Sequence, residues 1–147
     1  MPVGTTTVER SRVVAAAPER IWRLVADPHH QPRWWPGVER MEGVEGDRFT
    51  QVLRTRRGRA VRVDYSVIAA RAGELVVWRQ ELEGSPFARV LSAAEIRIAL
   101  RPCAAGTRVS ITHVQRLRGS NRTGGWMLAR ATRRRSEEAL SRLAELL

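Results

Sequence analysis

Residues 61–67 read VRVDYSV, and every second side chain in this stretch is apolar or aromatic while those between are charged or polar. Successive side chains of a β-strand point to opposite faces, so a period of two predicts a strand with one apolar face and one wet face. Such a strand is typical of an antiparallel sheet that is buried on one side only.

The same alternation recurs at residues 76–82, 94–100 and 109–115. Short turn signals that contain glycine separate the stretches, as at Gly73 and within residues 101–106. Strands joined by so few residues form hairpins. The pattern therefore predicts a meander of about six strands between Val38 and Leu117.

The N-terminal part of the chain predicts one more strand and two short helices. Residues 5–16 are rich in threonine and valine, which favour a strand. Pro18 favours the first turn of a helix. Asp27 before Pro28 predicts the end of that helix and the cap of a second one, which stops at residues 36–37.

The period changes to a helical one after residues 119–121, and the apolar spacing predicts one long helix from about Arg122 to Leu147. This helix is the only predicted element large enough to cover the apolar face of the sheet. We therefore expect an α+β fold, in which a curved antiparallel sheet of about seven strands surrounds a long C-terminal helix, with two short helices after the first strand. No repeat or linker divides the sequence, so residues 1–147 are expected to form a single domain.

All 26 cationic side chains are arginines, and the formal net charge is +11. The lack of lysine excludes Schiff-base chemistry. A basic chain can bind nucleic acid or anionic surfaces, but the arginines are spread along the sequence with one cluster at residues 133–135. A solvated helix face is the preferred interpretation of that cluster, so nucleic acid is not favoured as a partner.

The single cysteine, Cys103, excludes an intramolecular disulfide and a thiolate metal site. No nucleotide or cofactor motif is present in the sequence, so no cofactor is expected. No apolar run approaches the roughly 20 residues of a membrane span. The N-terminal residues carry charges and lack the apolar core of a signal peptide, which predicts a cytoplasmic location.

Three segments carry a resemblance to a known superfamily, namely residues 16–22 (AAPERIW), 26–28 (ADP) and 34–38 (WWPGV). With the order of predicted elements, they resemble the helix-grip fold of the START-like, or SRPBCC, superfamily and its polyketide cyclase/dehydrase branch. Residues 107–109 and 124–125 also look like this family. The resemblance implies a cavity between sheet and long helix that takes a lipid, a polyketide or another apolar molecule. It implies no shared catalytic residue.

Polar side chains on the inward face of the strands are the candidates for ligand contact, because pockets are mostly apolar with a few placed polar groups. His113 is the leading acid/base candidate and Tyr65 the second. The alternative is that these groups satisfy one another or reach solvent at the cavity mouth. The resemblance adds two tryptophans at the cavity entrance, and further aromatic walls are expected. The predicted ligand-binding set is Trp34, Trp35, Gln51, Leu53, Tyr65, Trp78, Gln80, Ile96, His113, Gln115, Trp126 and Met127.

Two further clusters were weighed as sites. His29 and His30 are adjacent in a loop, but neighbouring side chains point apart and no ligand spacing completes a site, so no metal is expected. Glu9 and Ser11 share a strand face with Val13, which predicts a carboxylate near the cavity.

Three hypotheses about function remain open at this point. The leading one is a protein that binds a small hydrophobic molecule without catalysis. The second is a cyclase or dehydratase for a polyketide-like substrate, in which His113 with Tyr65 or Gln80 would move protons. The third is an interaction protein whose arginines meet nucleic acid, an acidic protein or anionic lipid. A strand edge or the outer sheet face could also form a homodimer.

Overall fold

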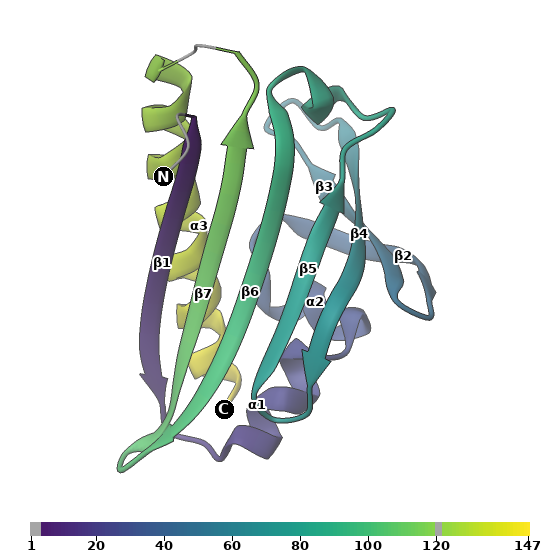
Figure 1. Ribbon diagram of the computed structural model, residues 1–147. Helices are drawn as coiled ribbons and strands as arrows, with labels where there is room; N and C mark the ends of the chain where they lie inside the picture. Colours follow the sequence, from purple (N-terminus) through teal and green to yellow (C-terminus); the bar gives the residue numbers. More distant parts are fainter. Residues whose placement is uncertain (1–3, 120–121) are drawn as a thin grey trace.

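The computed structural model describes residues 4–119 and 122–147, and its main feature is a curved sheet of seven strands (Figure 1). The strands lie in the order β1-β7-β6-β5-β4-β3-β2, and all neighbours are antiparallel. Six consecutive strands form the predicted meander, and the first strand pairs with the last. The strands are β1 (Thr5–Val14), β2 (Val38–Glu45), β3 (Arg48–Arg54), β4 (Ala60–Arg71), β5 (Leu75–Glu81), β6 (Leu91–Cys103) and β7 (Gly106–Leu117).

One long helix and several short ones accompany the sheet, so the predicted helix-grip arrangement is confirmed. The helices are α1 (Pro18–Val25), the 3-10 turn η1 (Pro28–His30), α2 (Gln31–Trp34), the 3-10 turn η2 (Pro86–Arg89) and α3 (Arg122–Leu146). Figure 1 shows α3 running along the strands behind β1 and β7, with α1 near the bottom of the view and α2 behind β5 and β4.

The register across the sheet aligns the inward side chains in rows. Trp78 of β5 lies opposite Ile96 of β6, which lies opposite His113 of β7. Tyr65 of β4 lies opposite Gln80 of β5. These pairings follow from the period-two pattern, because a strand with one buried face tolerates no slip of one residue. They bring the inward polar groups of three strands into one region.

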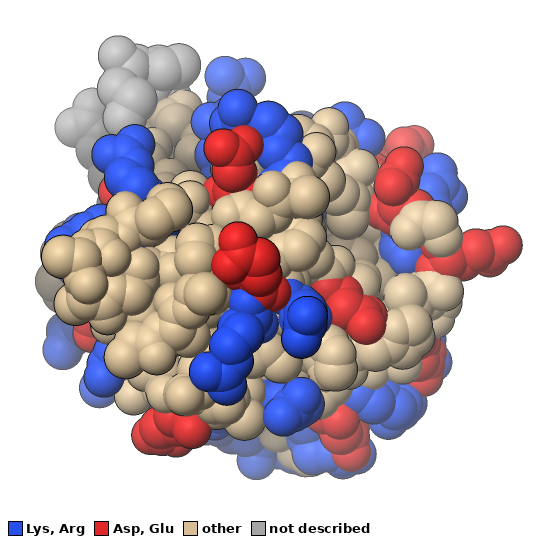
Figure 2. All heavy atoms as spheres, turned by 90° about the horizontal axis from the view of Figure 1, so that it is seen from below, with Lys and Arg blue, Asp and Glu red and all other residues tan. Residues whose placement is uncertain are grey.

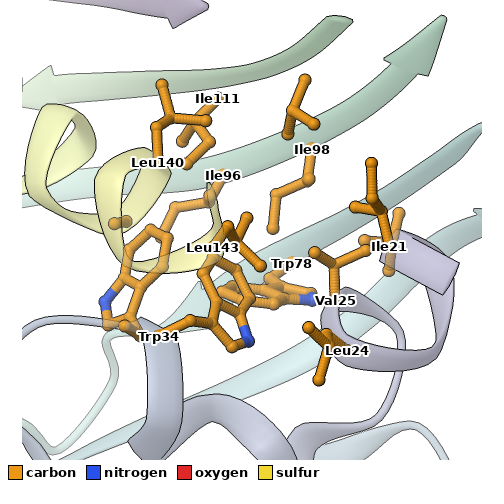
Figure 3. Close-up of a cluster of buried hydrophobic side chains, with 14 of the residues drawn as sticks. Ile21, Leu24, Val25, Trp34, Trp78, Ile96, Ile98, Ile111, Leu140 and Leu143 are labelled. Carbon is orange, nitrogen blue, oxygen red and sulfur yellow. The ribbon is translucent and has the colours of Figure 1, made fainter. Parts of the chain in front are cut away.

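The segment between β1 and β2 closes one end of the sheet. Pro18 begins α1, and the Asp27 side chain caps η1 by accepting a hydrogen bond from the backbone N–H of His29 at 3.0 Å. Three apolar side chains of α1 are buried in the core, and Figure 3 shows them beside the tryptophans and the sheet. They are Ile21, Leu24 and Val25.

The two halves of α3 differ in what they present to the sheet. In the C-terminal half, Leu140 and Leu143 are fully buried against Ile98 and Ile111 of the sheet (Figure 3). In the N-terminal half, the residues toward the sheet are shorter, with Ala129 and Thr132 buried. The helix therefore fills the concave face at one end and leaves more room at the other.

The outer face of the sheet carries much of the arginine excess in exposed ion pairs. Arg54 bonds Glu39 at 2.8 Å, and Arg97 bonds Glu95 at 2.8 Å. Exposed ion pairs of this kind contribute little to stability, because water and salt screen them. Seen from below in Figure 2, arginine and acidic side chains are interspersed. These arginines thus belong to a surface of mixed charge, as expected for a solvated face.

The expectation of a carboxylate from β1 near the cavity is wrong. Val8 and Val14 are the inward residues of this strand and are buried, whereas Glu9 and Ser11 are exposed on the opposite face. The Ser11 hydroxyl lies 2.8 Å from that of Ser110 on the neighbouring strand. Over residues 4–119 and 122–147, no helix is both long and apolar enough to cross a membrane.

The tip of the β6–β7 hairpin packs closely against the end of β1. Gly106 has a φ of +136°, and a methyl group there would collide with the Val14 carbonyl oxygen and lie 3.0 Å from the Ala15 Cα. The buried Thr107 hydroxyl donates to the Ala16 carbonyl at 2.7 Å. Only glycine allows this approach, which sets where the chain turns from the sheet into α1.

Gly106→Ala should therefore destabilise the protein more than Gly58→Ala. Gly58 also has a positive φ, of +78°, but a methyl group added there would meet no other atom within 4 Å, so this position isolates backbone strain. We expect a loss of about 1 kcal/mol for Gly58→Ala and a further 1–3 kcal/mol, roughly, for the collision at Gly106. Urea unfolding measures both, and equal losses would contradict the close packing at the hairpin tip.

Candidate functional site

A cavity of about 230 Å³ lies between the sheet and the N-terminal half of α3. Strands β3 to β7 line one side, η2 contributes Phe87, and α3 contributes Leu128, Ala131, Thr132 and Arg135. Those four α3 positions follow a spacing of three, one and three residues, which places them on one face of the helix. The cavity reaches the surface beside Arg135, whose side chain is exposed.

Short side chains create this space. Ala94 of β6 lines the cavity on the sheet side, and Ala131 and Thr132 line it on the helix side. Where α3 continues toward its C-terminus, Leu140 and Leu143 occupy the equivalent volume. Interiors are normally close-packed, so a change from leucine to alanine and threonine along one helix face opens a cavity.

An aromatic cluster forms the floor of the cavity. Trp35 packs edge-on against Trp34 and Trp78, with ring centroids 5.3 and 5.4 Å apart. Phe49 stacks on Tyr65 and meets Trp78 edge-on, both at 5.3 Å. Edge-to-face and offset contacts of this kind add about 1 kcal/mol per pair beyond area burial. The floor is consequently rigid and apolar.

His113 lies on this floor and is electrically neutral. Its ring stacks on Trp35 with centroids 5.8 Å apart and 30° between the planes. Burial and the nearby positive charge of Arg135 lower the pKa of His113 from 6.5 to about 4. Its Nε2 atom is buried without a hydrogen-bond partner among the described residues, so it requires a water molecule or a ligand group as partner.

Tyr65 and Gln115 supply two more polar groups to the cavity. Burial raises the pKa of Tyr65 to about 12 although Arg135 opposes the rise, so the phenol stays protonated at neutral pH. The Gln115 Oε1 atom is buried, and within the described part of the chain it accepts no hydrogen bond. Together with His113, these residues line one continuous space.

Gln51 shows the alternative outcome, in which inward polar groups satisfy one another. Its Nε2 donates to the Oε1 of Gln31 at 2.6 Å, and both side chains are buried. Gln31 belongs to α2 and is not among the candidate residues of the sequence analysis. The Gln31 Nε2 and the Trp34 Nε1 are themselves buried without a partner among the described residues.

The structure brings together eight of the twelve residues of the predicted ligand-binding set. Trp34 and Trp78 instead lie in the core beneath the cavity and do not line it. Trp126 and Met127 point outward with 62% and 61% of their side chains exposed, and Trp126 lies 5.9 Å from the Arg130 guanidinium. Ligand contact itself stays a prediction for all twelve. The eight that line the cavity are Trp35, Gln51, Leu53, Tyr65, Gln80, Ile96, His113 and Gln115.

Arg135 is the cation among the lining residues that the predicted ligand-binding set does not include. It was grouped with Arg133 and Arg134 as a solvated face, but it lines the cavity. A signal was present, since Arg135 stands seven residues after Leu128 and four before Ala139, both on the apolar stripe of the helix. A cation at that spacing faces the sheet.

The remaining candidate groups form no second site. His29 Nδ1 and His30 Nε2 lie 3.0 and 3.7 Å from the Asp27 carboxylate, so the pair is engaged with its own helix cap. No group of three histidine, cysteine or carboxylate side chains that could hold a metal occurs in the described ranges. Cys103 is exposed at the end of β6.

Comparison with known proteins gives a family and several similar folds. The family model described as polyketide cyclase / dehydrase and lipid transport matches residues 5–147. Sequence comparison with curated proteins finds no match.

Three similar solved structures share 15–19% sequence identity with the chain, a level at which the likeness concerns the fold. The di-domain aromatase/cyclase StfQ of the steffimycin pathway matches with a TM-score of 0.78 and 18% identity over 96% of this chain, which spans 50% of the StfQ chain. Protein NE0264 from Nitrosomonas europaea has a TM-score of 0.75 and 15% identity, covering 100% of this chain and 96% of its own. The ZhuI aromatase/cyclase from Streptomyces sp. R1128 has a TM-score of 0.72 and 19% identity, and the match covers 96% of this chain and 92% of the ZhuI chain.

The neutral state of His113 predicts a pH dependence of stability. Between pH 6.5 and about 4 the unfolded chain binds a proton at this histidine and the folded chain does not. The contribution is therefore complete above pH 6.5 and is lost as the pH falls to about 4, by at most roughly 3 kcal/mol.

The measurement is the free energy of unfolding across this window for the wild type and for His113→Phe, which keeps a ring on Trp35 but cannot titrate. Carboxylates titrate in both proteins and cancel in the difference. Parallel curves would contradict the assignment of a depressed pKa to His113.

Proposed function

We propose, because the chain belongs to the polyketide cyclase / dehydrase and lipid transport family, that it binds a small, mostly apolar molecule in the cavity between the sheet and α3. The observation that carries the proposal is a cavity with an aromatic floor that His113 and Gln115 line, and the buried atoms His113 Nε2 and Gln115 Oε1 have no partner among the described residues. A buried polar group without a partner costs free energy. Ligand groups that bond these atoms would regain it while the apolar walls exclude water.

The size of the cavity limits the ligand. Pockets for drug-sized molecules measure about 300–1,000 Å³, and an apolar cavity of about 150 Å³ holds one benzene ring. The 230 Å³ found here thus suits one ring with substituents or a branched chain of similar bulk. A long acyl chain or a molecule of several fused rings would require the helix and η2 to move apart.

The protonation states favour binding over acid/base catalysis. A general base is most effective when its pKa lies near the working pH, whereas His113 has a pKa of about 4 and Tyr65 of about 12. Near pH 7 the first is a weak base and the second a weak acid. Both are well suited to hydrogen bonding with a neutral group.

A cyclase or dehydratase activity is the second candidate, because His113 and Tyr65 line the same cavity. Such a reaction begins with removal of a proton next to a carbonyl group. A bound ligand that shielded the charge of Arg135 would raise the pKa of His113 toward its usual value and make it a better base.

Filling the cavity should abolish binding. Ala94 lines the cavity and is 7% exposed, while its neighbour Ala93 is exposed on the opposite face, so the two positions form a matched pair. We expect Ala94→Phe to weaken binding of 3-phenylpropanamide at least tenfold and Ala93→Phe to leave it within twofold. Calorimetry measures the affinities.

If the phenylalanine of Ala94→Phe overpacks the core and unfolds the protein, the smaller change Ala94→Leu replaces it in the test. Unfolding curves show whether each variant is folded. Equal affinity in the Ala93 and Ala94 variants, or no binding to the wild type, would overturn the proposed site. Mass spectrometry of a denatured extract of the purified protein tests for a co-purifying apolar compound.

The two candidate functions differ in one elementary step. A binding protein should not accelerate exchange of the protons beside the carbonyl of 4-phenylbutan-2-one in deuterated water, measured by NMR. A positioned general base accelerates such a step by about 10²–10⁴-fold. If the wild type accelerates this proton exchange and His113→Gln does not, the function is catalysis and not binding alone.

A further inference from the structure

Two charged residues line the cavity, and they differ in their partners. Glu95 lines it, but its carboxylate bonds the Arg97 guanidinium at 2.8 Å. Arg135 takes part in no ion pair or side-chain hydrogen bond with any other described residue. Two glutamates of α3 bond elsewhere, Glu137 to Arg10 and Glu138 to Arg142. The cavity therefore carries one uncompensated positive charge.

The charge of Arg135 acts on the interior of the cavity. Burial lowers the pKa of His113 on β7 and Arg135 adds to that shift, while burial raises the pKa of Tyr65 on β4 and Arg135 opposes that rise. His113 is neutral, so it offers no second cation, and Glu95 is already paired. An anion entering the cavity would meet a guanidinium and no competing carboxylate from the described lining residues.

The polar groups of the cavity are of two types, one cation and several neutral groups. Arg135 is a fixed cation with a planar set of donors that matches a carboxylate. Gln115 Oε1 is a buried acceptor and His113 Nε2 a second buried atom that find no partner among the residues described. Trp35 and Tyr65 line the same cavity and supply its aromatic surface.

We propose that the ligand is a small carboxylic acid, about one substituted ring in size, whose carboxylate pairs with Arg135 while its apolar body rests on the aromatic floor. This inference rests on the proposed binding function and adds the charge of the ligand. A phosphate would also suit Arg135, but the phosphorylated lipids that carry one exceed the 230 Å³ of the cavity. The unpartnered Gln115 oxygen favours an acid that also bears a hydroxyl or amide N–H.

The helix supplies a matched control, because Arg134 is the neighbour of Arg135 and is exposed without lining the cavity. Arg135→Gln and Arg134→Gln remove the same charge from the same helix. Comparing them separates a direct pair with the ligand from the effect of net charge.

Calorimetry at about pH 7 would compare 3-phenylpropanoate with 3-phenylpropanamide, which share one apolar body and differ in charge. We expect the wild type to bind the acid about tenfold more tightly than the amide, and Arg135→Gln to lose this preference. Arg134→Gln should keep it within twofold, and the amide should bind all three proteins alike. In Arg135→Gln without ligand, NMR should show the pKa of His113 raised, and Arg134→Gln should leave it unchanged.

The two proposals fail in different ways. If the amide binds and the acid binds no more tightly, the inference about charge is wrong while the binding function stands. An equal loss of acid affinity in both arginine variants would likewise overturn the pair with Arg135. If neither compound binds the wild type, both the binding function and this inference are overturned.

Discussion

The packing of Trp34, Trp35 and Trp78 is the interaction on which the rest of the structure depends. These rings join α2 to the middle of the sheet, with centroids 5.3–6.2 Å apart. Each is at most 2% exposed. Because the cluster fills the centre of the concave face, it separates a solid core beside α1 from a hollow region beside the start of α3. The tryptophans thus belong to the hydrophobic core and also form the lower boundary of the cavity.

The long helix turns this division into a site. Along one face it changes from alanine and threonine to leucine, so a single straight element seals one end of the sheet and leaves space at the other. Arg135 stands at the transition. A cation there is tolerated because the Arg135 side chain is exposed. Burial chiefly lowers the pKa of His113 and keeps it neutral, and the charge of Arg135 adds to this effect. The sequence of α3 therefore sets both the space and the charge of the cavity.

The distribution of polar groups agrees with a binding role better than with a proton-transfer role. Near pH 7 the polar groups that face the cavity are either neutral or, like Arg135, always charged. Tyr65 and His113 could titrate, but their pKa values of about 12 and about 4 lie far from pH 7. Gln31 and Gln51 bond each other. Among the residues that line the cavity, His113 Nε2 and Gln115 Oε1 are the buried side-chain atoms that lack a partner in the described part of the chain. By its description the family includes polyketide cyclases or dehydrases and lipid transport proteins.

The sequence alone determined the faces of the strands and the order of the elements, because alternation, glycine turns and helical spacing are local properties of the chain. It therefore predicted that Tyr65, Gln80, His113 and Gln115 share the inner face. Tertiary structure alone decided which of these groups meet a partner. Gln51 bonds Gln31 from a different element, and Trp126 points outward, because strand alternation specifies a side of the sheet but neither depth nor the rotation of α3. The cavity and the place of Arg135 depend on how side chains from five strands and one helix fill a shared volume, which no local pattern specifies.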